Sequence, residues 1–208
     1  MNVFLIAATS LDGFIAPSRD QISTNWTSKE DRTFFSKKTK EAGVVVMGSS
    51  TYKTIGRPLP GRSNVVYSRK NIQSVIDDTG DSIRFVRFEE MDPGFRRDDD
   101  TGGDLKNAQS NTVFLTQLAP RQLLNGLEKA GYSEVAICGG ASIYSQFMQA
   151  GVVDSLFITV EPIIFGAGVK LFSDQVKASL SLVKVAQFES GGVVLEYKVR
   201  GQSLGLRA

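Results

Sequence analysis

Short apolar runs rich in β-branched residues alternate along this chain with segments of helical spacing. The runs cover residues 3–8, 44–47, 65–67, 83–88, 135–138, 155–160, 180–188 and 193–199. Residues 28–42, 120–131 and 140–150 carry apolar positions at helical spacing, and 49–55 is predicted to form a short helix. Strands that alternate with helices predict an α/β fold with a largely parallel sheet.

Local signals mark several element ends. Ser28 precedes a helix that has Glu30 and Asp31 in its first turn, where carboxylates favour the helix N-terminus. Gly131 is a suitable stop for the helix before it. The turn sequence at 189–192 predicts a hairpin, so the C-terminal edge of the sheet is expected to be antiparallel.

Residues 89–111 depart from this alternation because they are polar, rich in turn residues and longer than an ordinary connection. We interpret them as a flexible surface insertion, with a functional lid as the alternative. No repeat or domain boundary is apparent, so residues 1–208 are expected to form one domain.

Composition narrows the chemistry. The 208 residues include no histidine and one cysteine, Cys138, and the net charge is +2. Histidine-based triads, histidine or cysteine metal sites and an intrachain disulfide are therefore excluded. The charge gives no electrostatic reason to expect a nucleic-acid or membrane partner. Without a basic leader or an apolar stretch of membrane-spanning length, the chain is expected to be cytoplasmic.

Two glycine-marked turns join a strand to a helix. Gly139 and Gly140 follow the run 135–138, and Gly48 follows the run 44–47. Small residues let a ligand approach the backbone, and free N–H groups at a helix start attract phosphate. The two turns together favour a nucleotide cofactor. Ordinary helix capping by serine and threonine is the alternative for the turn at Gly48.

The stretch 55–63 holds two prolines, two glycines and two arginines. It is predicted to be a rigid connection, and Arg57 and Arg62 are candidates for binding an anion. A turn with two solvated arginines is the alternative.

Asp31 stands out among the acidic residues. Within a helix it shares a face with Phe35, four residues later, so both would point into the same pocket. A buried carboxyl there would have a raised pKa and could relay a proton or bind a flat heterocycle through paired hydrogen bonds. A solvated acid in the first helical turn is the alternative.

Taken together, these positions resemble dihydrofolate reductase in order and spacing between residues 3 and 159. The resemblance implies that family's α/β fold, with a mostly parallel central sheet, an antiparallel C-terminal strand and flanking helices. The positions that carry it are Trp26, Asp31, Phe35, 46–48, Thr51, Tyr52, 55–62, Asn64, Ser68, 137–140, Ile143, Tyr144, Leu156 and Thr159.

The resemblance also implies an activity, the NADPH-dependent reduction of 7,8-dihydrofolate in tetrahydrofolate biosynthesis and one-carbon metabolism. Asp31 would bind the pterin and assist protonation at N5, with Trp26 over the site entrance and Thr159 bonded to Asp31 through water. Arg62 would hold the glutamate α-carboxylate. The folate pocket would be lined by Ile6, Ala8, Phe35, Ile55 and Leu59.

The resemblance implies that NADPH is held mainly by residues 49–51, 68–70 and 139–144. It also implies a cis peptide bond between Gly139 and Gly140. Hydride would pass from nicotinamide C4 to pterin C6. The implied cofactor residues are Ala8, Ile15, Gly48, Ser49, Ser50, Thr51, Ser68, Arg69, Lys70, Cys138, Gly139, Gly140, Ala141, Ser142, Ile143 and Tyr144.

Departures from the folate pattern leave alternatives open. Ser49 replaces an arginine that holds the 2′-phosphate of NADPH, so Arg69 and Lys70 are expected to serve instead and NADH is not excluded. Residues 10–16 and 162–172 resemble the riboflavin-pathway branch, which reduces a ribosylamino-pyrimidine phosphate. The stretch 57–62 is of the folate type. A nucleotide-binding module without catalysis is the alternative of another class, and oligomeric state stays undetermined.

Overall fold

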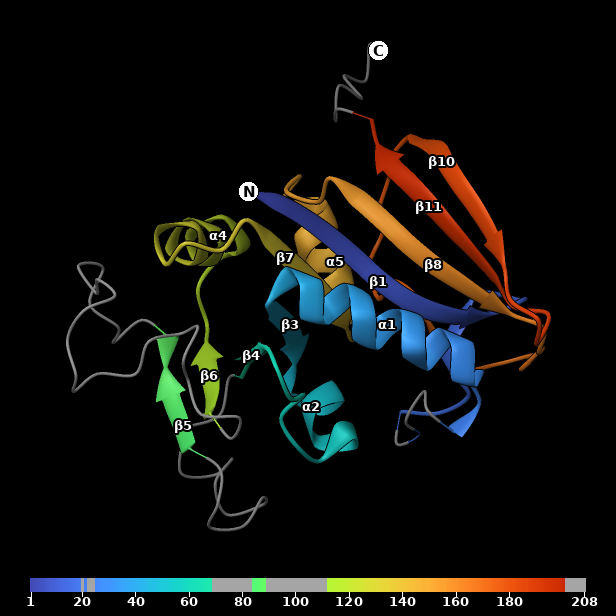
Figure 1. Cartoon of the computed structure of the whole chain (residues 1–208), viewed down its shortest axis with the longest axis horizontal. Helices are drawn as coiled ribbons and strands as arrows, with labels where there is room; N and C mark the ends of the chain where they lie inside the picture. The colour runs from blue at the N-terminus through green and yellow to red at the C-terminus, as the bar shows by residue number, and fades with distance from the viewer. Residues whose placement is uncertain (20, 22–24, 69–83, 89–111, 201–208) are drawn as a thin grey trace.

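A nine-stranded sheet runs through the computed structural model, which describes residues 1–19, 21, 25–68, 84–88 and 112–200 (Figure 1). Its spatial order is β10-β11-β8-β1-β7-β3-β4-β6-β5. The strands are β1 (Asn2–Ser10), β3 (Val44–Gly48), β4 (Ser63–Tyr67), β5 (Arg84–Arg87), β6 (Thr112–Thr116), β7 (Glu134–Gly139), β8 (Ser155–Glu161), β10 (Leu180–Gln187) and β11 (Val193–Val199).

The pairing confirms a mostly parallel sheet with an antiparallel C-terminal edge. Every neighbouring pair from β8 across to β5 is parallel. Strand β11 runs antiparallel to β8 and to β10. The predicted hairpin joins β10 to β11, where the Phe188 N–H donates to the Gly192 carbonyl at 2.8 Å.

Helices cover both faces of the sheet. In Figure 1, α1 (Lys29–Ala42) lies in front of β1 and β7, and α5 (Ala141–Gln149) lies behind them. The helices α4 (Pro120–Lys129) and α5 pack on a core that includes Leu5 and Phe147. The opposite core includes Phe4 and lies under α1 and α2 (Ser49–Ile55). Burying each such large side chain contributes roughly 1.5–3 kcal/mol.

Helix α1 begins and ends where the sequence predicts. The Ser28 side chain caps its first turn, and Gly43 ends it at a φ of 73°. That left-handed backbone conformation suits glycine, which has no Cβ to clash.

Strand β6 is the main element that the sequence pattern missed. It directly follows the polar segment 89–111, and its buried Val113, Phe114 and Leu115 form a run of only three apolar residues. The two-stranded sheet of β2 (Phe14–Ala16) and β9 (Val169–Lys170) was also missed, because strands this short carry no periodic signal. The predicted insertion at 89–111 lies outside the described residues.

Candidate functional site

The candidate site lies at the carboxyl ends of the parallel strands. Strands β1, β3, β7 and β8 end at Ser10, Gly48, Gly139 and Glu161, so these residues meet at one edge of the sheet. Ligands in open α/β sheets collect at this edge. The first turn of α1 joins it, because both the Ser28 N–H and the Ser28 hydroxyl donate to Glu161 Oε1 at 2.8 Å.

Asp31 lies in this first turn and is buried, with 8% of its surface exposed. Its backbone N–H donates to the Ser28 hydroxyl at 3.1 Å. Burial is the main cause that raises the pKa of the Asp31 carboxyl, and the nearby charge of Glu161 raises it further. Hydrogen bonds from the side chains of Thr159 and Thr27 oppose this shift without cancelling it. Asp31 therefore holds its proton to a higher pH than a solvated aspartate does.

Trp26 presents an unsatisfied donor close in sequence to this turn. Its indole packs edge-on against Phe165, with ring centroids 5.1 Å apart. Nε1 is buried and has no hydrogen-bond partner among the described residues. A buried N–H without an acceptor costs free energy, so a ligand or water that accepts from it would be favoured.

Apolar residues predicted for the substrate pocket gather on the α1 and α2 side of the sheet. Ile6 is buried there, Phe35, Ile55 and Leu59 pack against the same core, and Ala8 is half-buried on β1. Asn64 holds the connection between α2 and β4, because its side chain accepts from the Leu59 N–H at 2.8 Å and donates to the carbonyls of Leu59 and Arg62.

Arg62 turns toward α1 from that connection. Nη1 donates to the Thr39 hydroxyl and Nε donates to the Pro60 carbonyl at 3.1 Å. Its guanidinium is half-buried, and burial lowers its pKa from the usual value. Arg57 is exposed. Of the two arginines, Arg62 is thus the one that is oriented by neighbouring groups.

Glycines make a close-packed cradle between β3, β7 and the starts of α2 and α5. A Cβ at Gly140 would lie 3.1 Å from Thr51 Oγ1, and one at Gly48 would lie 3.2 Å from Ile143 Cγ1. Gly139 has a φ of +127°, which only glycine adopts readily, and the Gly139–Gly140 bond is cis, as the resemblance implies. Larger side chains at Gly48 and Gly140 would collide with Ile143 and Thr51, so these two turns pack directly on the starts of α5 and α2.

Tyr144 and Cys138 lie beside this cradle, and the pKa of each is raised. The Tyr144 hydroxyl donates to the Ile6 carbonyl at 2.8 Å, and a Cβ at Gly139 would lie 3.3 Å from that hydroxyl. Burial raises the pKa of Tyr144 and that of the Cys138 thiol well above their usual values. A raised pKa of the Cys138 thiol disfavours the thiolate, which is the nucleophilic form of cysteine.

The other residues predicted to hold the cofactor lie on several elements. Ser68 is buried after β4, and its N–H donates to the Thr116 carbonyl at 3.2 Å. Ser49 and Ser50 begin α2, Ala141 and Ser142 begin α5, and Ile15 lies on β2. Arg69 and Lys70 lie outside the described residues.

Two loops close one side of the site. The Asp12 carboxylate accepts the N–H groups of Phe165 and Gly166, at 3.2 and 2.7 Å, and the Ser10 hydroxyl at 2.6 Å. These bonds, the Ser10 bond foremost, lower the pKa of Asp12. The bonds from Phe165 and Gly166 to Asp12 connect the loop after β1 to the loop that carries Phe165. The ring of Phe165 is the one that contacts the Trp26 indole.

The sequence analysis did not identify Glu161, which is 3% exposed at the end of β8. It also did not identify the hydrogen bonds that Ser28 makes to Glu161 and that Thr27 makes to Asp31. One signal was present. Residues two apart on a strand share a face, so Glu161 should follow Thr159 into the same site.

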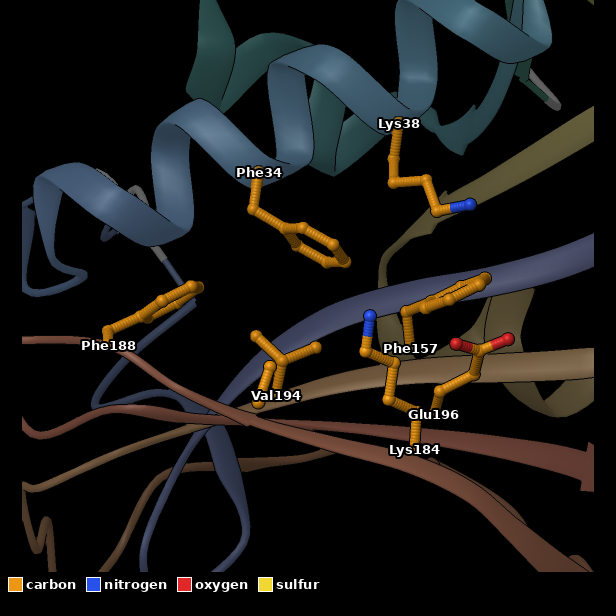
Figure 2. A pocket seen from close by; sticks show the side chains of 8 residues that line it. Phe34, Lys38, Phe157, Lys184, Phe188, Val194 and Glu196 are labelled. Atoms are coloured by element: carbon orange, nitrogen blue, oxygen red, sulfur yellow. The ribbon is translucent and has the colours of Figure 1, made fainter.

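A separate cavity of about 230 Å³ lies between α1 and the C-terminal hairpin (Figure 2). Figure 2 shows Phe34 and Lys38 pointing from α1 toward Phe157, with Lys184 and Glu196 below. None of the predicted site residues lines it, so it is distinct from the candidate site. Its lining residues are Phe34, Lys38, Phe157, Lys184, Ala186, Phe188, Val194 and Glu196.

Across the described part of the chain, no group of three acidic, histidine or cysteine residues is arranged to hold a metal ion. No described helix has the length and apolar character needed to cross a membrane.

Comparison with known proteins points to one group of reductases. The family described as RibD C-terminal domain matches residues 2–194. The uncharacterized protein YyaP of Bacillus subtilis is 22% identical over 96% of each chain. A dihydrofolate reductase of Buchnera aphidicola is 25% identical over 80% of this chain and 75% of its own.

Solved structures show the same fold. A pyrimidine reductase-like protein from Corynebacterium diphtheriae matches 96% of this chain and 92% of its own, with a TM-score of 0.65 and 19% identity. Dihydrofolate reductase from Enterococcus faecalis, complexed with NADP(H), matches 96% of both chains with a TM-score of 0.61 and 18% identity.

Proposed function

Because this chain belongs to the RibD C-terminal domain family and has the dihydrofolate reductase fold, we propose that it reduces 7,8-dihydrofolate to 5,6,7,8-tetrahydrofolate with NADPH. The superfamily comprises NAD(P)H-dependent reductases, and the substrate is the part that we infer. The observation that carries the inference is Asp31, a buried acid with a raised pKa that is hydrogen-bonded by Thr159 and Thr27.

Asp31 suits the two tasks that this substrate sets. A carboxyl group can pair with the amino and ring nitrogens of a pterin, and a raised pKa lets it keep its proton to a higher pH than an ordinary aspartate. Reduction of a C=N bond needs a proton at nitrogen as well as a hydride at carbon. Asp31 would hold that proton for N5, and the buried Nε1 of Trp26 would donate to a substrate or water acceptor.

The far end of the substrate would meet Arg62. A guanidinium fork matches a carboxylate, and the bonds to Thr39 and Pro60 orient this fork before a ligand arrives. The apolar side chains of Phe35, Ile55 and Leu59 would contact the aromatic part between the two ends and exclude water from it.

The glycine cradle fits a dinucleotide cofactor. Gly139 and Gly140 let this turn pack closely on the side chains of Thr51 and Tyr144, and a phosphate of the cofactor would bind at the N–H groups that begin α5. When bound, NADPH supplies the hydride. The chain supplies orientation, exclusion of water and the proton-bearing acid. Arg69 and Lys70 would favour NADPH over NADH by binding the 2′-phosphate.

A riboflavin-pathway reductase that acts on a ribosylamino-pyrimidine phosphate is the second candidate. The family match over residues 2–194 favours it, and so do the stretches 10–16 and 162–172. The folate-type connection 57–62 and the buried Asp31 favour the first candidate.

The test supplies NADPH with dihydrofolate or with the ribosylamino-pyrimidine phosphate and follows NADPH oxidation. We expect turnover with dihydrofolate, and a strong loss of it in Asp31→Asn. Turnover with the pyrimidine alone would overturn the proposal in favour of the second candidate. NADPH binding without turnover of either compound would indicate a binding module.

A further inference from the structure

Glu161 is a buried carboxylate that the proposed function leaves without a task. It is the last residue of β8, two residues after Thr159, and only 3% of its surface is exposed. An isolated buried carboxylate is costly, so its neighbours must compensate for the water it has lost. Its position on the same strand face as Thr159 brings it to the site that holds Asp31.

Ser28 links Glu161 to Asp31. Glu161 Oε1 accepts both the Ser28 N–H and the Ser28 hydroxyl hydrogen at 2.8 Å. The same hydroxyl oxygen accepts the Asp31 N–H at 3.1 Å. Since the hydroxyl has a single hydrogen and donates it to Glu161, its lone pairs are directed toward the helix. Glu161 therefore sets the orientation of the cap that holds the first turn of α1.

The C-terminal hairpin supports this arrangement from behind. A Cβ at Gly192 would lie 3.2 Å from Glu161 Oε2 and 3.2 Å from Phe188 Cδ2, so the turn packs closely on the carboxylate. The Ser190 N–H donates to Glu30 Oε1 at 3.1 Å, which ties the same turn to the first turn of α1. The helix start is thus held from both β8 and the hairpin.

Three ionisable groups contribute to the electrostatic environment of Asp31. The charge of Glu161 on β8 raises the pKa of Asp31, and Arg32 on α1 lowers it by less. Tyr144 on α5 also interacts with Asp31, but its own pKa is raised well above the usual value, so it is neutral at neutral pH. Glu161 is therefore the negative charge among them that favours a proton on Asp31.

We propose that Glu161 is a positioning residue of this site, which holds the Asp31 turn through Ser28 and brings its carboxylate close enough to interact with the acid. The proposal rests on the proposed function in one respect, because it takes Asp31 to be the proton donor. Its role is exerted through Asp31 and Ser28, and it makes no contact with substrate.

The experiment compares wild type with Glu161→Gln, which keeps an acceptor oxygen and removes the charge. Carbon NMR of the Asp31 carboxyl, recorded on the free protein across a pH series, gives its titration midpoint. We expect the midpoint to fall, because a neighbouring negative charge is lost. The high-pH limb of the turnover profile should move to lower pH by the same amount, with NADPH affinity unchanged. Glu196→Gln, outside the Asp31 cluster, is the matched control and should leave the midpoint in place.

An unchanged Asp31 midpoint in folded Glu161→Gln would overturn the proposal. Glu161→Asp is the second variant, because it keeps the charge and draws the carboxylate back from Ser28. It should retain a raised midpoint while kcat falls severalfold at constant NADPH affinity. If Glu161→Gln does not fold, a Glu161→Asp protein with wild-type turnover would overturn the proposal. The titration uses no substrate, so a shifted midpoint without dihydrofolate turnover would overturn the proposed function alone.

Discussion

The Arg62 guanidinium donates a hydrogen bond through Nη1 to the hydroxyl of Thr39, a residue buried on α1. Thr39 passes its own hydroxyl hydrogen to the Phe35 carbonyl at 2.7 Å, so its oxygen is free to accept from Arg62. The pair joins the connection before β4 to the middle of α1. The hydrogen bond also orients Arg62, which is half-buried, whereas Arg57 in the same connection is exposed.

Replacement of Arg62 by glutamine should raise the KM for dihydrofolate by roughly 10-fold to 100-fold and leave kcat nearly unchanged. A lost hydrogen bond to a charged group accounts for that range. The measurement is steady-state kinetics with dihydrofolate and with dihydropteroate, which has no glutamate. The variant should equal wild type on dihydropteroate. Arg57→Gln, an exposed control, should be unaffected, and an equal loss on both substrates would contradict the role of Arg62.

Asp31→Asn should lower kcat for dihydrofolate by about 10²-fold to 10⁴-fold at neutral pH, the usual contribution of a positioned acid. NADPH affinity, measured by titration calorimetry, should stay near wild type. The matched control is Glu41→Gln, an exposed acid on the same helix, which should keep full activity. Full activity in Asp31→Asn would remove Asp31 from the mechanism.

The same variant should alter how stability depends on pH. The folded-state pKa of Asp31 is raised, so its contribution is fully present below the unfolded-state pKa and is lost as pH rises through the folded pKa. Asp31→Asn should therefore be more stable than wild type at pH 7, and this advantage should shrink below pH 4. Urea unfolding at both pH values measures it, and an advantage that grows at low pH would contradict the raised pKa.

The sequence predicted most of the sheet because its strands are distinct apolar runs bounded by glycine or polar residues. It also predicted Asp31, Arg62 and the glycine turns as candidates, since each residue type has a recognisable chemistry. Glu161 was missed because a single acid at a strand end looks solvated until the helix that covers it is placed. Strand β6 was missed because its run is short and adjoins a long polar segment.

Gly126→Ala should destabilise the protein by about 1 kcal/mol, although alanine favours helices. A Cβ at Gly126 of α4 would lie 2.8 Å from Cε1 of Phe88, whose ring is buried. Urea unfolding measures the change. In a Phe88→Leu background the same substitution should become stabilising, because the obstructing ring edge is gone. A stabilising effect in the wild-type background would show that the ring moves aside freely.

Gly140→Ala should weaken NADPH binding by about tenfold or more while the protein stays folded. The φ of Gly140 is −80°, a value that residues with a side chain also adopt. The new methyl would press on Thr51 Oγ1 and narrow the approach to the start of α5. Fluorescence titration with NADPH measures the affinity. Gln149→Ala, an exposed control at the other end of α5, should bind normally, and unchanged affinity in Gly140→Ala would exclude this cradle as the cofactor site.

Trp26→Phe should separate stability from activity. Phenylalanine keeps an aromatic edge against Phe165 and removes Nε1–H, which is buried without a partner among the described residues. Removing an unsatisfied donor should offset part of the free energy lost through the smaller ring, so the free energy of unfolding should change by less than about 1 kcal/mol. If Nε1 donates to the substrate or to its water, kcat/KM for dihydrofolate should fall about tenfold, while NADPH affinity stays constant. Urea unfolding and steady-state kinetics measure the two effects. A large loss of stability with unchanged kinetics would make Trp26 a packing residue alone.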